Sequence, residues 1–300
     1  DGDLHRARRR SIFILTPPLR MRFLRFLNDA GEATYAISHS DGALTVAEGS
    51  PFAGLRDTGR PAGTISHYLP PVDPTMVICI GLNYGKHADE LKLARPVNPV
   101  VFMKPPSSAT GHQSKVVKPR LTEKLDYEVE LAVVIGKPCK DVTEAEALEY
   151  VLGYTVANDL STRDWQKVPE LSGSQWCRSK GFDGFSPLGP VLVTREEIPD
   201  PGNLGLRSYV NGEKRQDSST SDLIFSVQQV VSFLSAGCTL TPGTVIMTGT
   251  PAGVAEGMPG QPWLNAGDQV VVEIDQIGAL QVEIVPDPST ARCFANMAKL

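Results

Sequence analysis

Short apolar runs separated by turn-forming residues make up most of the chain. Near the N-terminus three such runs, RFLRFL, EATYAI and ALTV, are separated by residues 28–31 and 40–42, whose Asn, Asp, Ser and Gly favour turns. Residues 54–74 are rich in Gly and Pro, which disfavours a helix. We therefore expect a small N-terminal β domain over residues 21–72 and a second, larger domain over residues 75–286.

The larger domain is predicted to contain many strands and few helices. Strands are expected at residues 76–81, 99–103, 125–136, 154–160, 206–209, 213–215, 244–247, 269–274 and 279–285, with Asn211-Gly212 as a type I′ hairpin turn. Helices are expected at residues 86–92, from the capping-box sequence at Thr143, and along the apolar stripe of Ile224, Val227, Val231 and Leu234 that ends at Gly237, whereas residues 175–185 are expected to form a loop. Because strands and helices do not alternate regularly, the pattern predicts a β-rich α+β fold.

One predicted strand, residues 125–136 (LDYEVELAVVIG), carries two carboxylates inside an apolar run. Side chains two residues apart on a strand lie on the same face, so Glu128 and Glu130 should project together while Val129 and Leu131 face the other way. Two neighbouring like charges beside apolar residues raise each other's pKa and destabilise the fold unless a cation neutralises them. A divalent metal site is one interpretation, and a solvent-facing edge strand whose charges prevent aggregation is the other.

The composition is that of an ordinary globular chain. Of its 300 residues 41% are hydrophobic and 21% are charged, which provides ample material for a core. The net charge of -5 argues against nucleic-acid binding, and no apolar run approaches the roughly 20 residues of a membrane helix. The five cysteines are scattered without a Cys-x-x-Cys pair, which favours a reduced intracellular protein and disfavours a structural zinc site.

The two ends of the chain carry weaker signals. Residues 1–20 include five arginines, but their aspartates and scarce serine fit a transit peptide poorly, so we interpret them as an extension ahead of Met21. In the tail, residues 287–300, the final Ala298-Lys299-Leu300 resembles the peroxisomal Ser-Lys-Leu signal, although a chance ending explains it better. We therefore expect a cytoplasmic location, with a mitochondrial or peroxisomal one as the alternatives.

A second candidate site lies just after a predicted buried strand. If residues 86–92 form a short helix, His87 and Glu90 lie three apart on one face. A carboxylate beside an imidazole orients the ring and raises its basicity, which is a common way to build a general base for water. The alternative is an incidental polar pair on a surface helix. Asp159, at the C-terminal end of another apolar strand, is a third acidic residue in a position where binding sites often occur.

Five motifs in one order resemble the fumarylacetoacetate hydrolase family. They are Gly81-Leu82-Asn83-Tyr84-x-x-His87-x-x-Glu90, Glu128-x-Glu130, Asp159 followed by Arg163-Asp164-x-Gln166, Lys180 within Ser-Lys-Gly-Phe-Asp, and Thr248-Gly249-Thr250-Pro251-x-Gly253-Val254. The resemblance covers residues 77–285. It implies a pseudo-barrel of mixed β-sheets, or β-roll, behind a small N-terminal β domain, usually assembled as a homodimer.

The resemblance also implies a metal site and a mechanism. Glu128, Glu130 and Asp159 would be the ligands, an oxygen-only set that suits Mg2+ or Mn2+, with Ca2+ possible. The metal would stabilise an enolate of the substrate, and a water would be activated by His87, oriented by Glu90.

Six further residues are candidates by the same resemblance. They are Lys180 and Gln166 as donors to an oxyanion or carboxylate, and Tyr84, Arg163, Thr250 and Lys104 as substrate contacts. For Arg163 a structural ion pair with Asp164 or another carboxylate is an equal alternative.

We accordingly expect a divalent-metal-dependent hydrolase that cleaves a carbon–carbon bond in a β-diketo or 2-oxo acid of the acylpyruvate or fumarylpyruvate type. Decarboxylation or tautomerisation of oxaloacetate, or isomerisation of 2-hydroxyhepta-2,4-diene-1,7-dioate, would use the same site and stays open. A non-catalytic metal-binding scaffold is a third possibility, since a fold alone does not establish a function. The expected partner is a small-molecule substrate, with neither nucleic acid nor membrane involved.

Overall fold

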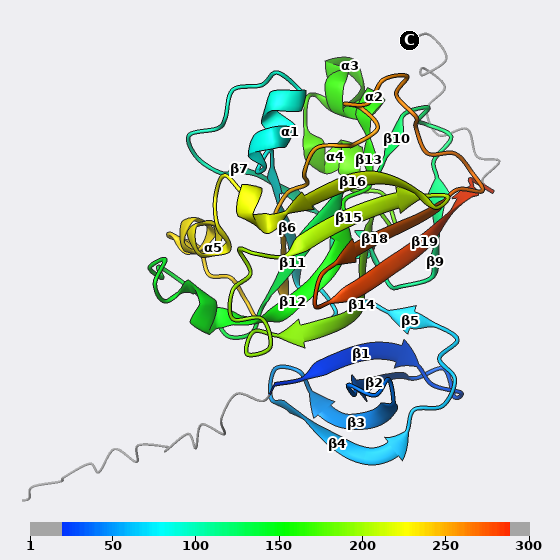
Figure 1. The fold of residues 1–300 in the computed structure, drawn as a ribbon, viewed down its shortest axis with the longest axis vertical. Coiled ribbons are helices and arrows are strands. Elements are labelled where there is room, and N and C mark those ends of the chain that lie inside the picture. Colours follow the sequence, from blue (N-terminus) through cyan, green and yellow to red (C-terminus); the bar gives the residue numbers. More distant parts are fainter. Residues whose placement is uncertain (1–19, 289–300) are drawn as a thin grey trace, which may run out of the picture.

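The structure is a computed structural model that describes residues 20–288, and β-sheet dominates it (Figure 1). The largest sheet has twelve strands. In spatial order they are β4 (Gly54–Pro61), β3 (Leu44–Ser50), β2 (Ala33–Ser38), β1 (Arg22–Leu27), β14 (Ser186–Thr194), β12 (Val151–Asn158), β11 (Val129–Ile135), β17 (Thr244–Met247), β6 (Met76–Gly81) and β7 (Val100–Lys104), with β5 (Tyr68–Leu69) beside β1 and β8 (Ala109–Thr110) beside β14. The predicted β-rich α+β class is confirmed.

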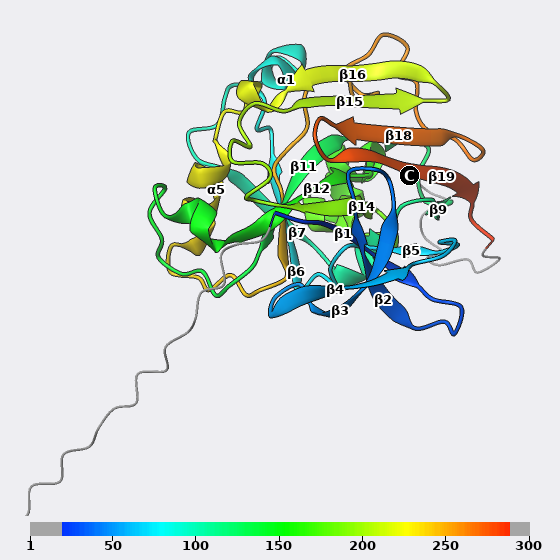
Figure 2. The ribbon, with the colours of Figure 1, turned by 60° about the horizontal axis from the view of Figure 1, so that its bottom comes forward.

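A second sheet of five strands packs across one face of the first (Figure 2). Its order is β16 (Glu213–Ser219), β15 (Gly205–Val210), β18 (Gln269–Ile274), β19 (Gly278–Pro286) and β9 (Ser114–Lys118), and β10 (Leu125–Asp126) pairs separately with β13 (Ser161–Thr162). The helices are short: α1 (Gly85–Glu90), α2 (Arg163–Lys167), α3 (Pro169–Ser172), α4 (Trp176–Lys180) and α5 (Val227–Ser235), with the 3-10 turns η1 (Pro106–Ser108), η2 (Ala147–Tyr150) and η3 (Thr220–Asp222). None of these helices has the length and apolarity that crossing a bilayer requires.

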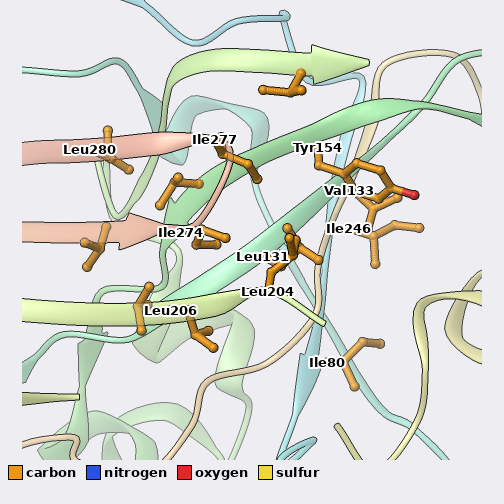
Figure 3. Close-up of a cluster of buried hydrophobic side chains, with 14 of the residues drawn as sticks. Ile80, Leu131, Val133, Tyr154, Leu204, Leu206, Ile246, Ile274, Ile277 and Leu280 are labelled. Carbon is orange, nitrogen blue, oxygen red and sulfur yellow. The ribbon is translucent and has the colours of Figure 1, made fainter. Parts of the chain in front are cut away.

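Strand β11 is buried on both faces. Leu131 and Val133 belong to the core between the two sheets, in one cluster with Ile274 of β18 (Figure 3). Ala132 and Val134, which point the opposite way, belong to a second buried cluster. This explains the near-continuous apolar run in the sequence, because a strand covered on both sides needs apolar residues at every position. The residues just before β11 are therefore attached to a strand that packing on both faces holds in place.

The hairpin and most strands lie where the sequence predicts them. Asn211 and Gly212 both have positive φ, as a type I′ turn requires. Helix α5 starts with a complete capping box between Ser226 and Gln229 and ends before Gly237, which has the φ of +72° expected after a helix.

The helix expected from Thr143 is wrong beyond its first turn. Thr143 does bond the Glu146 carboxylate through its N–H and its hydroxyl. The chain then forms only the 3-10 turn η2, because Val151 enters β12 and pairs with Ile135 of β11. Pairing in the sheet thus overrides a local helix signal.

Two further expectations need correction. A loop is expected over residues 175–185, but they contain helix α4, which ends at Lys180 with Gly181 as its C-cap. Residues 54–61, for which the sequence excluded a helix but predicted no strand, form β4. Strand β4 lies at the edge of the sheet, where a terminal Pro61 costs no ladder hydrogen bond.

The N-terminal strands continue into the large sheet. Strand β1 pairs with β14 through Arg22 opposite Val193 and Phe23 opposite Leu192. The strands β1 to β4 form the lower, blue part of Figure 1. The domain boundary near residues 72–75 stays a prediction, since continuity of the sheet does not decide whether the two parts unfold separately. Residues 1–19 and 289–300, including the Ala-Lys-Leu ending, lie outside the described part of the chain.

The junction between β1 and β14 leads to a stability prediction. Phe23 is 1% exposed, so Phe23→Ala should lower the free energy of unfolding by about 3–5 kcal/mol, measured by urea denaturation followed by circular dichroism. Phe52→Ala is the matched control, because Phe52 is 39% exposed and its loss should cost much less. Equal losses for the two variants would contradict a packed junction.

Candidate metal centre and catalytic site

The three predicted metal ligands meet at one buried point. Glu128, Glu130 and Asp159 each offer a carboxylate oxygen, and these oxygens lie within 4.8 Å of one another. The three residues are 4%, 2% and 0% exposed. The strand breaks between β10 and β11 at residues 127–128, yet Glu128 and Glu130 still face the same side.

The register of two strands brings the third carboxylate to the pair. Strands β11 and β12 are antiparallel, with Val129 opposite Asn158. The Asp159 N–H donates to the Glu128 carbonyl at 2.9 Å, and the Glu128 N–H donates to the Asn158 side chain at 3.0 Å. The end of β12 therefore places Asp159 directly beside the start of β11.

Lysine and arginine neutralise two of the three carboxylates. Lys180 Nζ donates to Glu128 at 2.9 Å and to Asp159 at 2.5 Å, and Lys104 Nζ donates to Asp159 at 2.6 Å. Arg163 donates to Glu128 at 2.5 Å. Burial alone would raise the pKa of Glu128, but the charges of Lys180 and Arg163 outweigh it and lower this pKa to about 2.

Among residues 20–288 Glu130 forms no hydrogen bond or ion pair with a basic side chain. Its carboxylate accepts the Gly249 N–H at 2.8 Å. Gly249 has a φ of +100°, and a Cβ there would lie 2.8 Å from the Asn83 Cβ, so only glycine presents this N–H well. Burial, together with the charges of Asp159 and Glu128, raises the pKa of Glu130 well above its usual range. A divalent cation would offset this repulsion between buried carboxylates, and the oxygen-only donors fit Mg2+, Mn2+ or Ca2+.

The His87–Glu90 pair forms as expected on α1. His87 Nδ1 lies 3.2 Å from Glu90 Oε2, and His87 is only 5% exposed. An ionised carboxylate can only accept, so Nδ1 carries the proton and Nε2 is left as a base. His87 is therefore buried and lines the site, whereas Glu90 is half-buried behind it, with 21% of its side chain exposed.

A cavity of about 270 Å3 joins the two halves of the site. Polar groups from both halves line it: His87, Glu128, Glu130, Asp159, Lys180, Gln166 and Thr250. An apolar wall completes it, including Leu91, Leu93, Val100, Phe102 and Trp176. Trp176 and Lys180 are one turn apart on α4, and both lie against Phe102. The ring centroids of Trp176 and Phe102 are 5.4 Å apart, and the Lys180 amine lies 5.0 Å from the centroid of the Phe102 ring.

Three predicted substrate contacts lie in different surroundings. Arg163 lines the cavity and forms the ion pairs that were the alternative to substrate binding, with Asp126 and Glu128 as the carboxylates and not Asp164. Lys104 is 2% exposed and also donates to the Phe185 carbonyl at 2.6 Å. Tyr84 is completely buried within the apolar core.

Sequence reasoning missed several residues of the site. Asp126 is fully buried against Arg163, and Glu256 lines the cavity and pairs with Lys167. Asp126 could have been noticed as a third acid in the LDYEVE sequence. Glu256 and Phe102 carry no local signal, because only the folded chain brings their segments to the cavity.

Comparison with known proteins agrees with this geometry. Residues 76–285 match the family model described as "Fumarylacetoacetate (FAA) hydrolase C-terminal". The chain is 43% identical to the mitochondrial oxaloacetate tautomerase of Xenopus laevis, in a match that covers 74% of this chain and 69% of that protein.

Solved structures show the same fold. The 2-hydroxyhepta-2,4-diene-1,7-dioate isomerase of Mycobacterium marinum is 37% identical, with a TM-score of 0.77 over 90% of this chain and 100% of that one. The fumarylpyruvate hydrolase of Pseudomonas aeruginosa, in complex with Mn2+ and pyruvate, is 32% identical, with a TM-score of 0.66 over 75% of this chain and 94% of that one. As its five motifs predicted, the chain belongs to the fumarylacetoacetate hydrolase family.

Proposed function

We propose that this protein is a divalent-metal-dependent enzyme that hydrolyses a carbon–carbon bond in a β-diketo acid of the acylpyruvate or fumarylpyruvate type. The observation that carries the proposal is one cavity that presents His87, backed by Glu90, together with Glu128, Glu130 and Asp159. A base and an oxygen-rich cation site on one cavity are what the addition of water to a polarised carbonyl compound requires.

The three carboxylates are suited to a divalent cation. Glu128, Glu130 and Asp159 would hold Mg2+ or Mn2+, or alternatively Ca2+. The bound cation would polarise the 2-oxo group and stabilise the negative charge that develops next to it. The Mn2+ and pyruvate in the related fumarylpyruvate hydrolase support both the metal and the kind of substrate.

The remaining residues supply proton transfer and orientation. His87 would take a proton from water at Nε2 while Glu90 keeps the Nδ1 proton in place. The water oxygen adds to the distal carbonyl carbon, and Lys180 and Gln166 are the donors proposed for the resulting oxyanion. The bond from that carbon to the methylene carbon then breaks. The proton held by His87 passes to the methylene carbon, which gives a carboxylic acid and pyruvate.

The proposed substrate contacts follow from the cavity lining. Gln166 and Thr250 reach the cavity, and we assign them to the substrate. Lys104 and Arg163 are assigned to holding Asp159 and Glu128, since their N–H groups are directed at these carboxylates. Lys180 also donates to both carboxylates, but an ammonium has three N–H groups, so one is left for the oxyanion.

Tautomerisation of oxaloacetate is the second candidate. The frog relative and a rat relative that is 40% identical are both named oxaloacetate tautomerases. In that reaction His87 would move a proton between the enol oxygen and the neighbouring carbon, and no water would be added. The two candidates therefore share the site and differ in whether an acid is released.

The assembly and the location stay predictions. A homodimer is expected from the family. A cytoplasmic location was expected from the sequence, whereas the frog and rat relatives are mitochondrial by name, which supports the mitochondrial alternative.

Removal of the metal should abolish turnover. EDTA should stop the reaction and Mg2+ or Mn2+ should restore it. Glu130→Gln should weaken Mn2+ binding by more than about ten-fold in titration calorimetry, because a ligand is lost. Glu123→Gln is the matched control, since Glu123 is exposed on the same stretch of chain. Undiminished turnover in EDTA would refute the metal dependence.

Removal of His87, the proposed base, should lower the rate of the reaction without changing metal binding. His87→Ala should lower kcat by about 10^2–10^4-fold, because general base catalysis is lost, while Mn2+ affinity stays the same. Lys86→Ala, an exposed neighbour on α1, should retain full activity. A His87→Ala enzyme with near-normal hydrolysis would exclude His87 as the base.

A substrate panel decides between the two candidates. Fumarylpyruvate, acetylpyruvate and oxaloacetate should be tested with Mg2+ or Mn2+, following the enol absorbance and the products. We expect loss of acylpyruvate enol with release of a carboxylic acid and pyruvate. Faster enol–keto exchange of oxaloacetate without acid release would favour the tautomerase. No change in any substrate, with metal bound, would contradict both.

A further inference from the structure

The loop of residues 249–257 reaches the catalytic base from one side. The Gly253 N–H donates to the two Glu90 carboxylate oxygens at 3.1 and 3.3 Å. Gly257 packs so closely that a Cβ on it would lie 2.4 Å from the Glu90 carboxyl carbon. The loop therefore fixes the carboxylate that orients His87.

The same loop is held from the other side by Asp126. This residue is 0% exposed, and its carboxylate accepts the Ala255 N–H at 2.8 Å and the Glu256 N–H at 3.1 Å. Tyr127 adds a hydrogen bond from its hydroxyl to the Gly253 carbonyl at 3.1 Å. One loop is thus fixed between two carboxylates, Asp126 and Glu90.

Arg163 connects Asp126 to the metal centre. Its Nε donates to Asp126 at 2.8 Å, one terminal nitrogen to Glu128 at 2.5 Å, and the other to Gln166 at 2.8 Å. A planar guanidinium holds its partners in a fixed geometry. The position of Glu128 therefore depends on where Asp126 anchors the arginine.

We propose that Asp126 is a positioning residue that sets the metal-binding carboxylate Glu128 and the His87–Glu90 pair relative to each other. It acts on the first through Arg163 and on the second through the loop. The inference deepens the proposed function, on which it rests for the roles of the two groups. Neither group is touched by Asp126 directly, so it takes no part in the reaction itself.

The chemistry of the contacts requires a carboxylate at this position. Asp126 receives N–H groups from Ala255, Glu256, Arg163 and Tyr127. An ionised carboxylate offers about four acceptor sites, enough for all of them. An asparagine keeps one acceptor oxygen and turns its own NH2 group toward a donor.

Asp126→Asn should therefore disturb both halves of the site. We expect Mn2+ affinity to fall by about 10–100-fold in calorimetry, as for other residues that support a metal ligand, and kcat to fall more than KM changes. The Hε1 resonance of His87, assigned with His87→Ala, should shift at constant pH. Asp164→Asn is the matched control: like Asp126, Asp164 accepts backbone N–H groups, here from Glu123 and Trp165, together with the Thr122 hydroxyl, but it bonds neither Arg163 nor the loop.

A lower melting temperature with unchanged Mn2+ affinity and an unchanged His87 resonance would overturn the proposal, because Asp126 would then only stabilise the fold. Equal effects from both asparagine variants would overturn it as well. The metal and resonance measurements do not need turnover. A wild-type protein without turnover would thus refute the proposed function, while these measurements would still decide the role of Asp126.

Discussion

Three carboxylates buried at one point are the constraint on which the rest of the structure depends. Charges in a low-dielectric interior repel strongly and lose their hydration, so each needs a partner. Lys180, Lys104 and Arg163 supply partners to Glu128 and Asp159, whereas within residues 20–288 Glu130 receives only a backbone N–H. A fold selected for stability alone would gain more from apolar residues here. The arrangement is therefore that of a site that could bind a divalent cation, and the needs of the core do not explain it.

The positions of the three carboxylates are fixed by the sheets and not by the helices around them. Strand β11 is buried on both faces, so its register with β12 fixes how Glu128, Glu130 and Asp159 face one another. The helices that complete the cavity have only five or six residues and gain little stability by themselves. They depend on the contacts that the metal-site carboxylates and the loop of residues 249–257 make with them, and the same groups thus serve both structure and function.

Local sequence signals made several strands and the carboxylate cluster predictable. Strands β6 and β17 have the predicted boundaries, because each apolar run ends sharply at turn residues. The cluster of Glu128, Glu130 and Asp159 was predictable once the motifs were seen together, and the structure brings them within reach of one cation. The features that were missed all depend on distant partners. The helix expected from Thr143 gave way to pairing with β11, and the importance of Asp126 appears only when the loop around Ala255 folds onto it.

Relatives that share this fold are named as a hydrolase, an isomerase and tautomerases, so the common core does not determine which reaction takes place. The proposed metal ligands and base would serve all of these reactions, since each would pass through an enol or enolate. Under the proposed function, what differs would be whether a water reaches the distal carbonyl beside His87. The apolar wall of the same cavity, in which Trp176 packs against Phe102 and Gly81, would limit that access. A substrate whose distal group packs against this wall would exclude water from the distal carbonyl, and a substrate with a smaller distal group would admit water. The choice of reaction would therefore depend on Phe102 and Trp176, which lie outside the motifs that define the family.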